Sequence, residues 1–185
     1  MRARLRIGLL TMVLLIGGVS SAAAQTPGPL SLDLRLGRGF GRTTGEYRNN
    51  HDGTVGEAIV ALRPLAIGPV GLVVAGGAAD HSTATYTLEC QPASNGGCVP
   101  SFPIFQIIMA QAGIETRGGT IRALAGPSLV WSEGNSAAGW SGHVTAAVRV
   151  APWIWLVASA AGHVIPDFRG DSFDLASVGI GLRIR

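Results

Sequence analysis

Eight stretches of the chain alternate apolar side chains with small, polar or charged ones. A period of two predicts β-strands, because successive side chains of a strand point to opposite faces. No stretch after residue 24 shows a convincing 3.6-residue period, so we predict an all-β fold with essentially no helix. The predicted strands span residues 30–37, 57–63, 70–77, 104–117, 121–131, 140–150, 154–164 and 176–185.

The segment before these strands has the pattern of a cleavable export signal. Three arginines within residues 2–6 precede an apolar run over residues 7–19, and small residues follow at 22–24. The run is shorter than the roughly 20 residues that a spanning helix needs, which argues against a membrane anchor. We therefore predict a signal peptide at 1–24 and one barrel domain at 25–185.

Removing the signal changes the charge of the chain. The sequence has 14 basic and 11 acidic residues, a net charge of +3, and the three signal arginines account for that excess. The mature chain is therefore neutral, and its charge does not indicate a nucleic-acid partner. Charged residues make up only 14% of the sequence, against about 25% in soluble domains. The mean hydropathy of +0.36 must then come from apolar surface spread over strands.

The connections between the predicted strands alternate between short and long. In outer-membrane barrels the short turns face the periplasm and the long loops face outside. An even number of strands then places both termini of the barrel domain on the periplasmic side. The short connections are 64–69, 118–119 and 151–152, and the long ones are 42–53, 80–103, 132–139 and 166–172.

Alternation alone does not say which face of the barrel lies inside. A soluble, lipocalin-like periplasmic barrel would turn its apolar face inward around an apolar ligand, and this alternative stays open. The polar face is mostly Gly, Ser and Ala, whereas a face in water would carry many Lys and Glu. Trp131, Trp140 and Trp153 lie near strand ends, where aromatic girdles form at membrane interfaces. We therefore predict that the apolar face points outward into lipid. The residues that test this orientation are Leu32, Val60, Val148 and Ile180.

With its signal, its strand number and its ordered connections, the chain resembles the small OmpA/OmpX-type outer-membrane β-barrel superfamily. The resemblance implies an eight-stranded antiparallel up-and-down transmembrane barrel in the bacterial outer membrane. It also implies surrounding lipid and insertion by the barrel-assembly machinery, and we expect a monomer. The chain departs from the family by ending in Arg185 rather than in an aromatic residue that the insertion machinery reads.

Several charged residues belong to the polar face and are predicted to point into the lumen. Buried charges are costly unless paired, so we expect a salt-bridge network that fills the barrel. A selective, porin-like pore is the alternative, although eight strands enclose little more than their own side chains. The predicted network consists of Asp33, Arg35, Glu57, Arg63, Glu115, Arg117, Arg122, Arg149 and Arg183.

The two cysteines lie in the longest predicted loop. Because exported proteins meet an oxidising environment, we predict a disulfide between Cys90 and Cys98. Loop closure makes it worth roughly 2–3 kcal/mol. Their spacing matches no zinc pattern, and we expect no metal site and no cofactor.

One pair of residues raises the question of catalysis. Ser141 and His143 share the inward face, and a Ser–His pair could act in a lipid A acyl hydrolase or transferase. Ordinary hydrogen bonding inside the lumen is the favoured interpretation. We therefore expect a non-enzymatic protein with a structural role, or with recognition or adhesion of an extracellular ligand through its long loops, and no nucleic-acid partner.

Overall fold

The computed structural model describes residues 30–44, 51–83, 87–90, 98–101, 104–132, 134–168 and 171–185. The predicted signal peptide lies outside these residues. The strands that they form are β1 (Leu30–Thr44), β2 (Gly53–Ile67), β3 (Val70–Thr83), β4 (Thr87–Cys90), β5 (Cys98–Ser101), β6 (Ile104–Thr116), β7 (Ile121–Ser132), β8 (Asn135–Ala151), β9 (Ile154–Phe168) and β10 (Asp171–Ile184).

Eight of these strands close into a barrel. Their order around the ring is β1-β10-β9-β8-β7-β6-β3-β2, and every neighbouring pair is antiparallel. The ring closes between β1 and β10, for example at Leu32 opposite Ile184. The predicted all-β, up-and-down architecture is confirmed, and the described residues contain no helix. None of them forms a helix long and apolar enough to cross a membrane.

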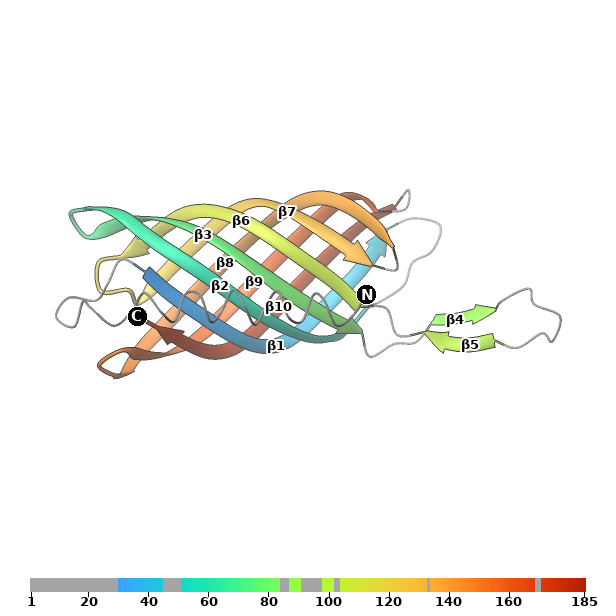
Figure 1. Cartoon of the computed structure of the whole chain (residues 1–185), viewed down its shortest axis with the longest axis horizontal. Coiled ribbons are helices and arrows are strands. Elements are labelled where there is room, and N and C mark those ends of the chain that lie inside the picture. Colours follow the sequence, from blue (N-terminus) through green and yellow to red (C-terminus); the bar gives the residue numbers. More distant parts are fainter. Residues whose placement is uncertain are drawn as a thin grey trace.

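β4 and β5 form a separate two-stranded hairpin. Figure 1 shows it beyond one end of the barrel, opposite the end that holds the C-terminus. The connections β2–β3, β6–β7 and β8–β9 all lie at the C-terminal end. We call this the basal end, and the end near the hairpin the loop end.

The barrel turns its apolar face outward. Ile180 and Val148 expose 69% and 68% of their surface, and the outward Leu32 and Val60 are half-buried beside neighbouring strands. The alternate face is buried, and Asp33 is fully inaccessible. A lipocalin-like arrangement would have the opposite sidedness, so the structure does not support the soluble alternative.

The strands run further than the apolar pattern indicates. The pattern assigns long loops to 132–139 and 166–172, but β7 runs to Ser132 and β8 begins at Asn135, and β9 runs to Phe168 and β10 begins at Asp171. Ladder pairing needs only backbone groups, so it continues through polar residues that carry no apolar period. This corrects two of the four predicted long loops.

β2 also extends past Pro64, where the sequence indicates a turn. Its pairing with β3 shifts register between Leu62 and Leu65, and the strand continues to Ile67. A register shift accommodates a proline because the ladder is already interrupted there. The turn between β2 and β3 therefore consists only of Gly68 and Pro69. Gly68 has a φ of 60°, a conformation that favours glycine.

The described side chains inside the barrel form three groups along its axis. An ion-pair group lies at the basal end, and a polar group with two histidines lies in the middle. An apolar group with three phenylalanines, packed as one hydrophobic cluster, lies toward the loop end. The outward belt and the filled lumen together show that the hydrophobic surface of the barrel lies mainly on its outside.

Candidate functional site in the barrel interior

The basal ion-pair cluster consists of Asp33, Glu115, Arg122, Arg183 and Arg185. Arg183 binds both oxygens of Asp33, with Nε to Oδ1 at 2.8 Å and Nη2 to Oδ2 at 2.9 Å. Nη2 of Arg122 lies 2.9 Å from Oε1 of Glu115, which also contacts Arg183 at 3.2 Å and Arg185. The planar guanidinium fork suits such two-oxygen contacts, so the carboxylates are well paired despite their burial.

The turn between β6 and β7 contributes backbone to this cluster. Nη1 of Arg183 donates to the carbonyl of Gly119 at 2.9 Å. Gly119 has a φ of 74°, and a Cβ at this position would collide with the guanidinium of Arg185. A glycine therefore allows both the backbone conformation and the close approach of the arginine.

The residues of the predicted network do not form a single group in the structure. Four of its residues (Asp33, Glu115, Arg122 and Arg183) meet in the basal cluster. Arg35 and Glu57 form a separate pair higher in the lumen, with Nη1 to Oε2 at 3.2 Å. Arg63 lies at the basal rim, where its Nη1 is 3.9 Å from Oε2 of Glu115 and its side chain is 18% exposed.

Arg117 and Arg149 do not belong to the network, which corrects their predicted positions. Both are exposed at the basal end. Arg149 donates from Nε and Nη2 to the carbonyls of Ala151 and Pro152 in the adjacent turn. At the end of the barrel a long side chain can reach water, so strand parity no longer places its charge inside. The predicted network does not include Arg185, although strand alternation places this residue on the same face as Arg183.

The histidine cluster consists of Glu57, Gln111, His143 and His163, with Arg35 beside Glu57. Nε2 of His143 contacts Oε1 of Glu57, and Nδ1 of His143 lies 2.7 Å from Nε2 of Gln111. The rings of His143 and His163 meet edge to face, with centroids 5.6 Å apart. These residues come from β2, β6, β8 and β9, so the cluster joins distant parts of the ring.

Ser141 and His143 do not form a nucleophile–base pair. The amide of Gln111 lies between them, because its Nε2 donates to Oγ of Ser141 at 2.8 Å. Ser141 itself donates to the carbonyl of Gly126 at 3.2 Å. Both residues are buried, at 4% and 2% exposure. A serine nucleophile needs direct contact with its base and access for substrate, and this arrangement offers neither.

Aromatic rings close the lumen toward the loop end. We call the rings of His51, Phe105, Phe168 and Phe173 the aromatic plug. Phe105 and Phe173 stack with centroids 4.5 Å apart, and His51 packs edge-on against both. His81 lies beside the plug, with its Nε2 2.6 Å from the carbonyl of His51.

The interior is also closely filled at the basal end. The crevice bordered by Ser31, Arg63 and Glu115 leaves no volume for a water molecule. Side chains thus occupy the lumen at the basal end and at the plug. This gives no support to the selective pore that the sequence left as an alternative.

The remaining predicted site residues lie outside the lumen. Trp140 and Trp153 are 65% and 67% exposed, and Trp131 is half-buried on the outward face of β7. Trp153 lies in the basal β8–β9 turn, whereas the other two flank the β7–β8 connection at the opposite end. In the β4–β5 hairpin, Cys90 is paired directly opposite Cys98.

Comparisons with solved structures identify the fold. The crystal structure of Neisserial surface protein A has a TM-score of 0.57 at 12% identity, covering 85% of this chain and 97% of that chain. Ail, the attachment invasion locus protein of Yersinia pestis, in complex with the heparin analogue sucrose octasulfate, has a TM-score of 0.49 at 12% identity, covering 84% and 99%. The outer membrane protease OmpT from Escherichia coli has a TM-score of 0.44 at 10% identity, covering 88% and 99%.

No family model matches the chain, and no curated protein matches its sequence. At 12% identity, the likeness to Neisserial surface protein A shows a shared fold and leaves function to be argued from the residues. The chain therefore has the fold of the small eight-stranded outer-membrane β-barrels, as its sequence predicts.

Proposed function

We propose that this protein is a non-enzymatic barrel of the bacterial outer membrane that presents its β4–β5 hairpin for recognition outside the cell. The carrying observation is the sidedness of the barrel wall, apolar outside and ionic inside. Leu36, Ile180 and Val148 are each at least 68% exposed on the outward face. Leaving such a side chain in water instead of an apolar medium costs about 1.5–3 kcal/mol, so lipid is the favourable surrounding.

The closed ring makes a lipid surrounding possible for the backbone as well. Within a bilayer core, every N–H and C=O must be paired inside the protein, and a barrel with no open edge achieves this. The β1–β10 ladder supplies the closing pairs, from Leu32 opposite Ile184 to Thr44 opposite Ser172. In such barrels the short turns face the periplasm, so the basal end would lie there and the hairpin outside.

The filled lumen supports a role that involves no transport and no catalysis. The aromatic plug and the basal ion-pair cluster obstruct passage along the axis, and Ser141 lacks a direct base. Recognition would then depend on the connections at the loop end. Insertion by the barrel-assembly machinery, a monomeric state and an extracellular ligand are parts of this proposal.

A disulfide in the hairpin would give that surface a fixed shape. Directly opposite residues of an antiparallel pair have Cα atoms about 4.5–5.5 Å apart, within the range of about 4.4–6.8 Å that a disulfide requires. Cys90 and Cys98 occupy such a position. We propose that they are oxidised in the exported protein and that the bond secures the end of the hairpin.

Cell fractionation tests the membrane part of the proposal. We expect the protein in the outer-membrane fraction, extracted only by detergent, with a faster migration on gels before heating than after it. Recovery in the soluble periplasmic fraction would contradict the proposal. A barrel with Val148→Glu and Ile180→Glu should fail to insert, whereas exchange of the exposed basal Arg149 for Glu should not prevent insertion.

Surface labelling tests the recognition part separately. A protease-cleavable epitope placed between β4 and β5 should be cut on intact cells, and the same epitope at Gly118 should be cut only after the outer membrane is opened. Deletion of the hairpin, residues 87–101, should abolish binding to host-cell or matrix surfaces while leaving heat-modifiable migration unchanged. Unchanged binding by that variant would show that the hairpin is not the recognition element.

A further inference from the structure

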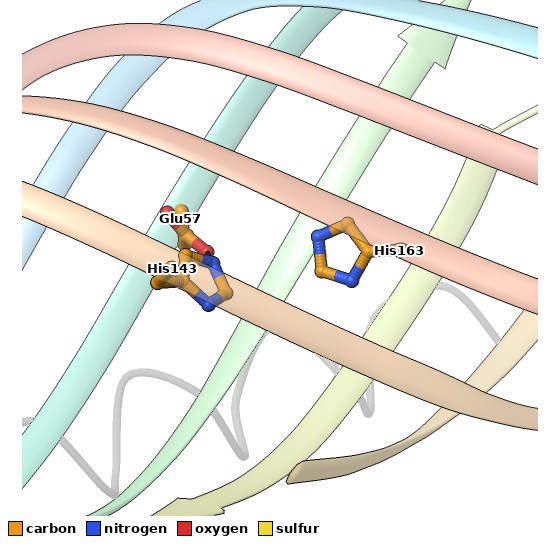
Figure 2. Close-up of side chains that lie close together, drawn as sticks. All are labelled: Glu57, His143 and His163. Carbon is orange, nitrogen blue, oxygen red and sulfur yellow. Dashed lines mark hydrogen bonds and ion pairs between the residues drawn. The ribbon is translucent and has the colours of Figure 1, made fainter. Parts of the chain in front are cut away.

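Three potential metal ligands meet inside the lumen. Glu57 from β2, His143 from β8 and His163 from β9 each place one ligand atom within 4.8 Å of the others. Figure 2 shows the Glu57 carboxylate beside the ring of His143, with the ring of His163 next to them. We propose that these residues bind a divalent transition-metal cation. Two imidazoles and one carboxylate are a ligand set that Zn²⁺ commonly takes.

The separation of the rings suits a shared cation. The centroids of His143 and His163 lie 5.6 Å apart, and their planes are inclined by 78°. Two imidazoles bound to one tetrahedral zinc by bonds of about 2.0–2.1 Å would have centroids about 5 Å apart. Small side-chain rotations would therefore bring both nitrogens to bonding distance. The metal would replace the proton that now joins Nε2 of His143 to Oε1 of Glu57, and Nδ1 of the same ring would carry that proton instead.

A second observation also points to a ligand. His163 is only 2% exposed, and its Nδ1 is buried without a hydrogen-bond partner. Buried polar atoms are normally paired, because an unpaired one retains the full cost of its desolvation. A metal bond to Nδ1 of His163 would offset this cost, and the same ring offers a ligand atom within 4.8 Å of those of Glu57 and His143.

Neighbouring side chains are placed to orient the ligands. Nη1 of Arg35 forms an ion pair with Oε2 of Glu57 at 3.2 Å, and Oε1 of the same carboxylate contacts His143. Gln111 lies 2.7 Å from Nδ1 of His143, and its own Oε1 has no partner. Rotation of that amide would let Oε1 accept a hydrogen bond from an N–H at Nδ1, and in that tautomer the Nε2 lone pair is free for a metal.

The positive charge of Arg35 limits the affinity of this site for a metal cation. A guanidinium close to the site repels a cation, and the repulsion is only weakly screened inside a protein. We therefore expect a dissociation constant on the order of 1 μM, weaker than that of structural zinc sites in soluble domains. Exchange of Arg35 for Gln should tighten binding, because Gln keeps a donor for Glu57 and removes the positive charge.

Binding would tie separated walls of the barrel together. β1 and β10 lie between β2 and β9 on one side of the ring, so Glu57 faces the histidines across the lumen. The expected consequence is a metal-dependent rise in melting temperature. At a free metal concentration about one hundred times the dissociation constant, the rise should be about 5–10 °C.

The experiment uses the untagged protein in detergent micelles, with both cysteines replaced by Ser so that thiolates cannot bind metal. The protein is folded with either Zn²⁺ or Co²⁺ present, because the filled lumen would obstruct later entry. Metal content after dialysis, the visible absorption of Co²⁺ and the melting temperature are measured. Heat-modifiable migration confirms that each variant is folded.

We expect one metal ion per chain and the rise in melting temperature given above. His163→Ala, His143→Ala and Glu57→Gln should each weaken binding at least about tenfold. His81→Ala is the matched control, because His81 is equally buried but lies outside the cluster, and it should bind like the parent. If an alanine variant does not fold, the corresponding Gln variant takes its place. Substoichiometric metal in the parent, or equal binding by the cluster variants and the control, would overturn the proposal.

Discussion

Glu115→Ala should destabilise the barrel strongly, because Glu115 neutralises several buried arginines. Oε1 of Glu115 lies 2.9 Å from Arg122 and 3.2 Å from Arg183, and it also contacts Arg185. Without Glu115, Arg122 and Arg183 still contact Asp33, whereas Arg185 loses the carboxylate that it contacts in the cluster. Removal of one partner from a buried ion pair typically costs 3–5 kcal/mol, so we expect a loss of about 4 kcal/mol.

The loss can be measured by urea unfolding of the barrel in detergent micelles, followed by tryptophan fluorescence and by heat-modifiable migration. With a denaturant dependence of about 2 kcal/mol per molar urea, the midpoint should fall by about 2 M. Asp174→Ala removes an exposed acid on β10 and should leave the midpoint within about 0.3 M of the parent.

A double variant separates the loss of the ion pair from the loss of packing. If Arg185 is removed together with Glu115, one of the stranded charges is gone, so the double variant should lose less than the two single losses added together. We expect a coupling energy of about 0.5–3 kcal/mol. Unchanged unfolding of Glu115→Ala, or strictly additive losses, would refute the inference that Glu115 is the shared counter-charge of the cluster.

Three further changes test other parts of the interior and its rim. Gly39→Ala should cost about 1–3 kcal/mol, because its Cβ would lie within 2.7 Å of the His81 ring, while Gly162→Ala, which meets open space, should change unfolding by less than about 0.5 kcal/mol. Phe173→Ala should lower the unfolding free energy by about 3–5 kcal/mol through a cavity in the aromatic plug, and a smaller loss would indicate that the plug is loosely packed. Arg149→Ala should change stability by less than about 1 kcal/mol, because this side chain is exposed at a turn, and a large loss would show that it has a buried partner after all.

Strand parity was sufficient to predict the face of most residues. The period of two placed Asp33, Glu115 and Arg183 inside and Val148 and Ile180 outside, because a residue's face depends only on its own strand. Parity failed at the basal end for Arg117 and Arg149, where a side chain can bend into water. Parity also did not predict that Phe168 points into the lumen, because the alternation predicts a loop over residues 166–172.

The contacts inside the lumen could not be predicted from parity. Glu57, His143 and His163 come from strands that are not all neighbours in the ring, so their meeting depends on barrel diameter and stagger. For the same reason, Gln111 was not recognised as the residue that separates Ser141 from His143. A sequence period describes one strand, whereas a site across the lumen depends on the closure of the whole sheet.

The central claim is that the barrel is apolar outside, in lipid, and polar inside. Its most direct test is a spin-label scan along β10 in lipid vesicles, with single cysteines at 175–178, 180 and 182 in a protein whose native cysteines are Ser. Labels at Ala176, Val178, Ile180 and Leu182 should collide mainly with oxygen, which concentrates in lipid, and labels at the buried positions Leu175 and Ser177 should be shielded from it. An inverted alternation, or equal access of all positions to a water-soluble nickel complex, would contradict the account.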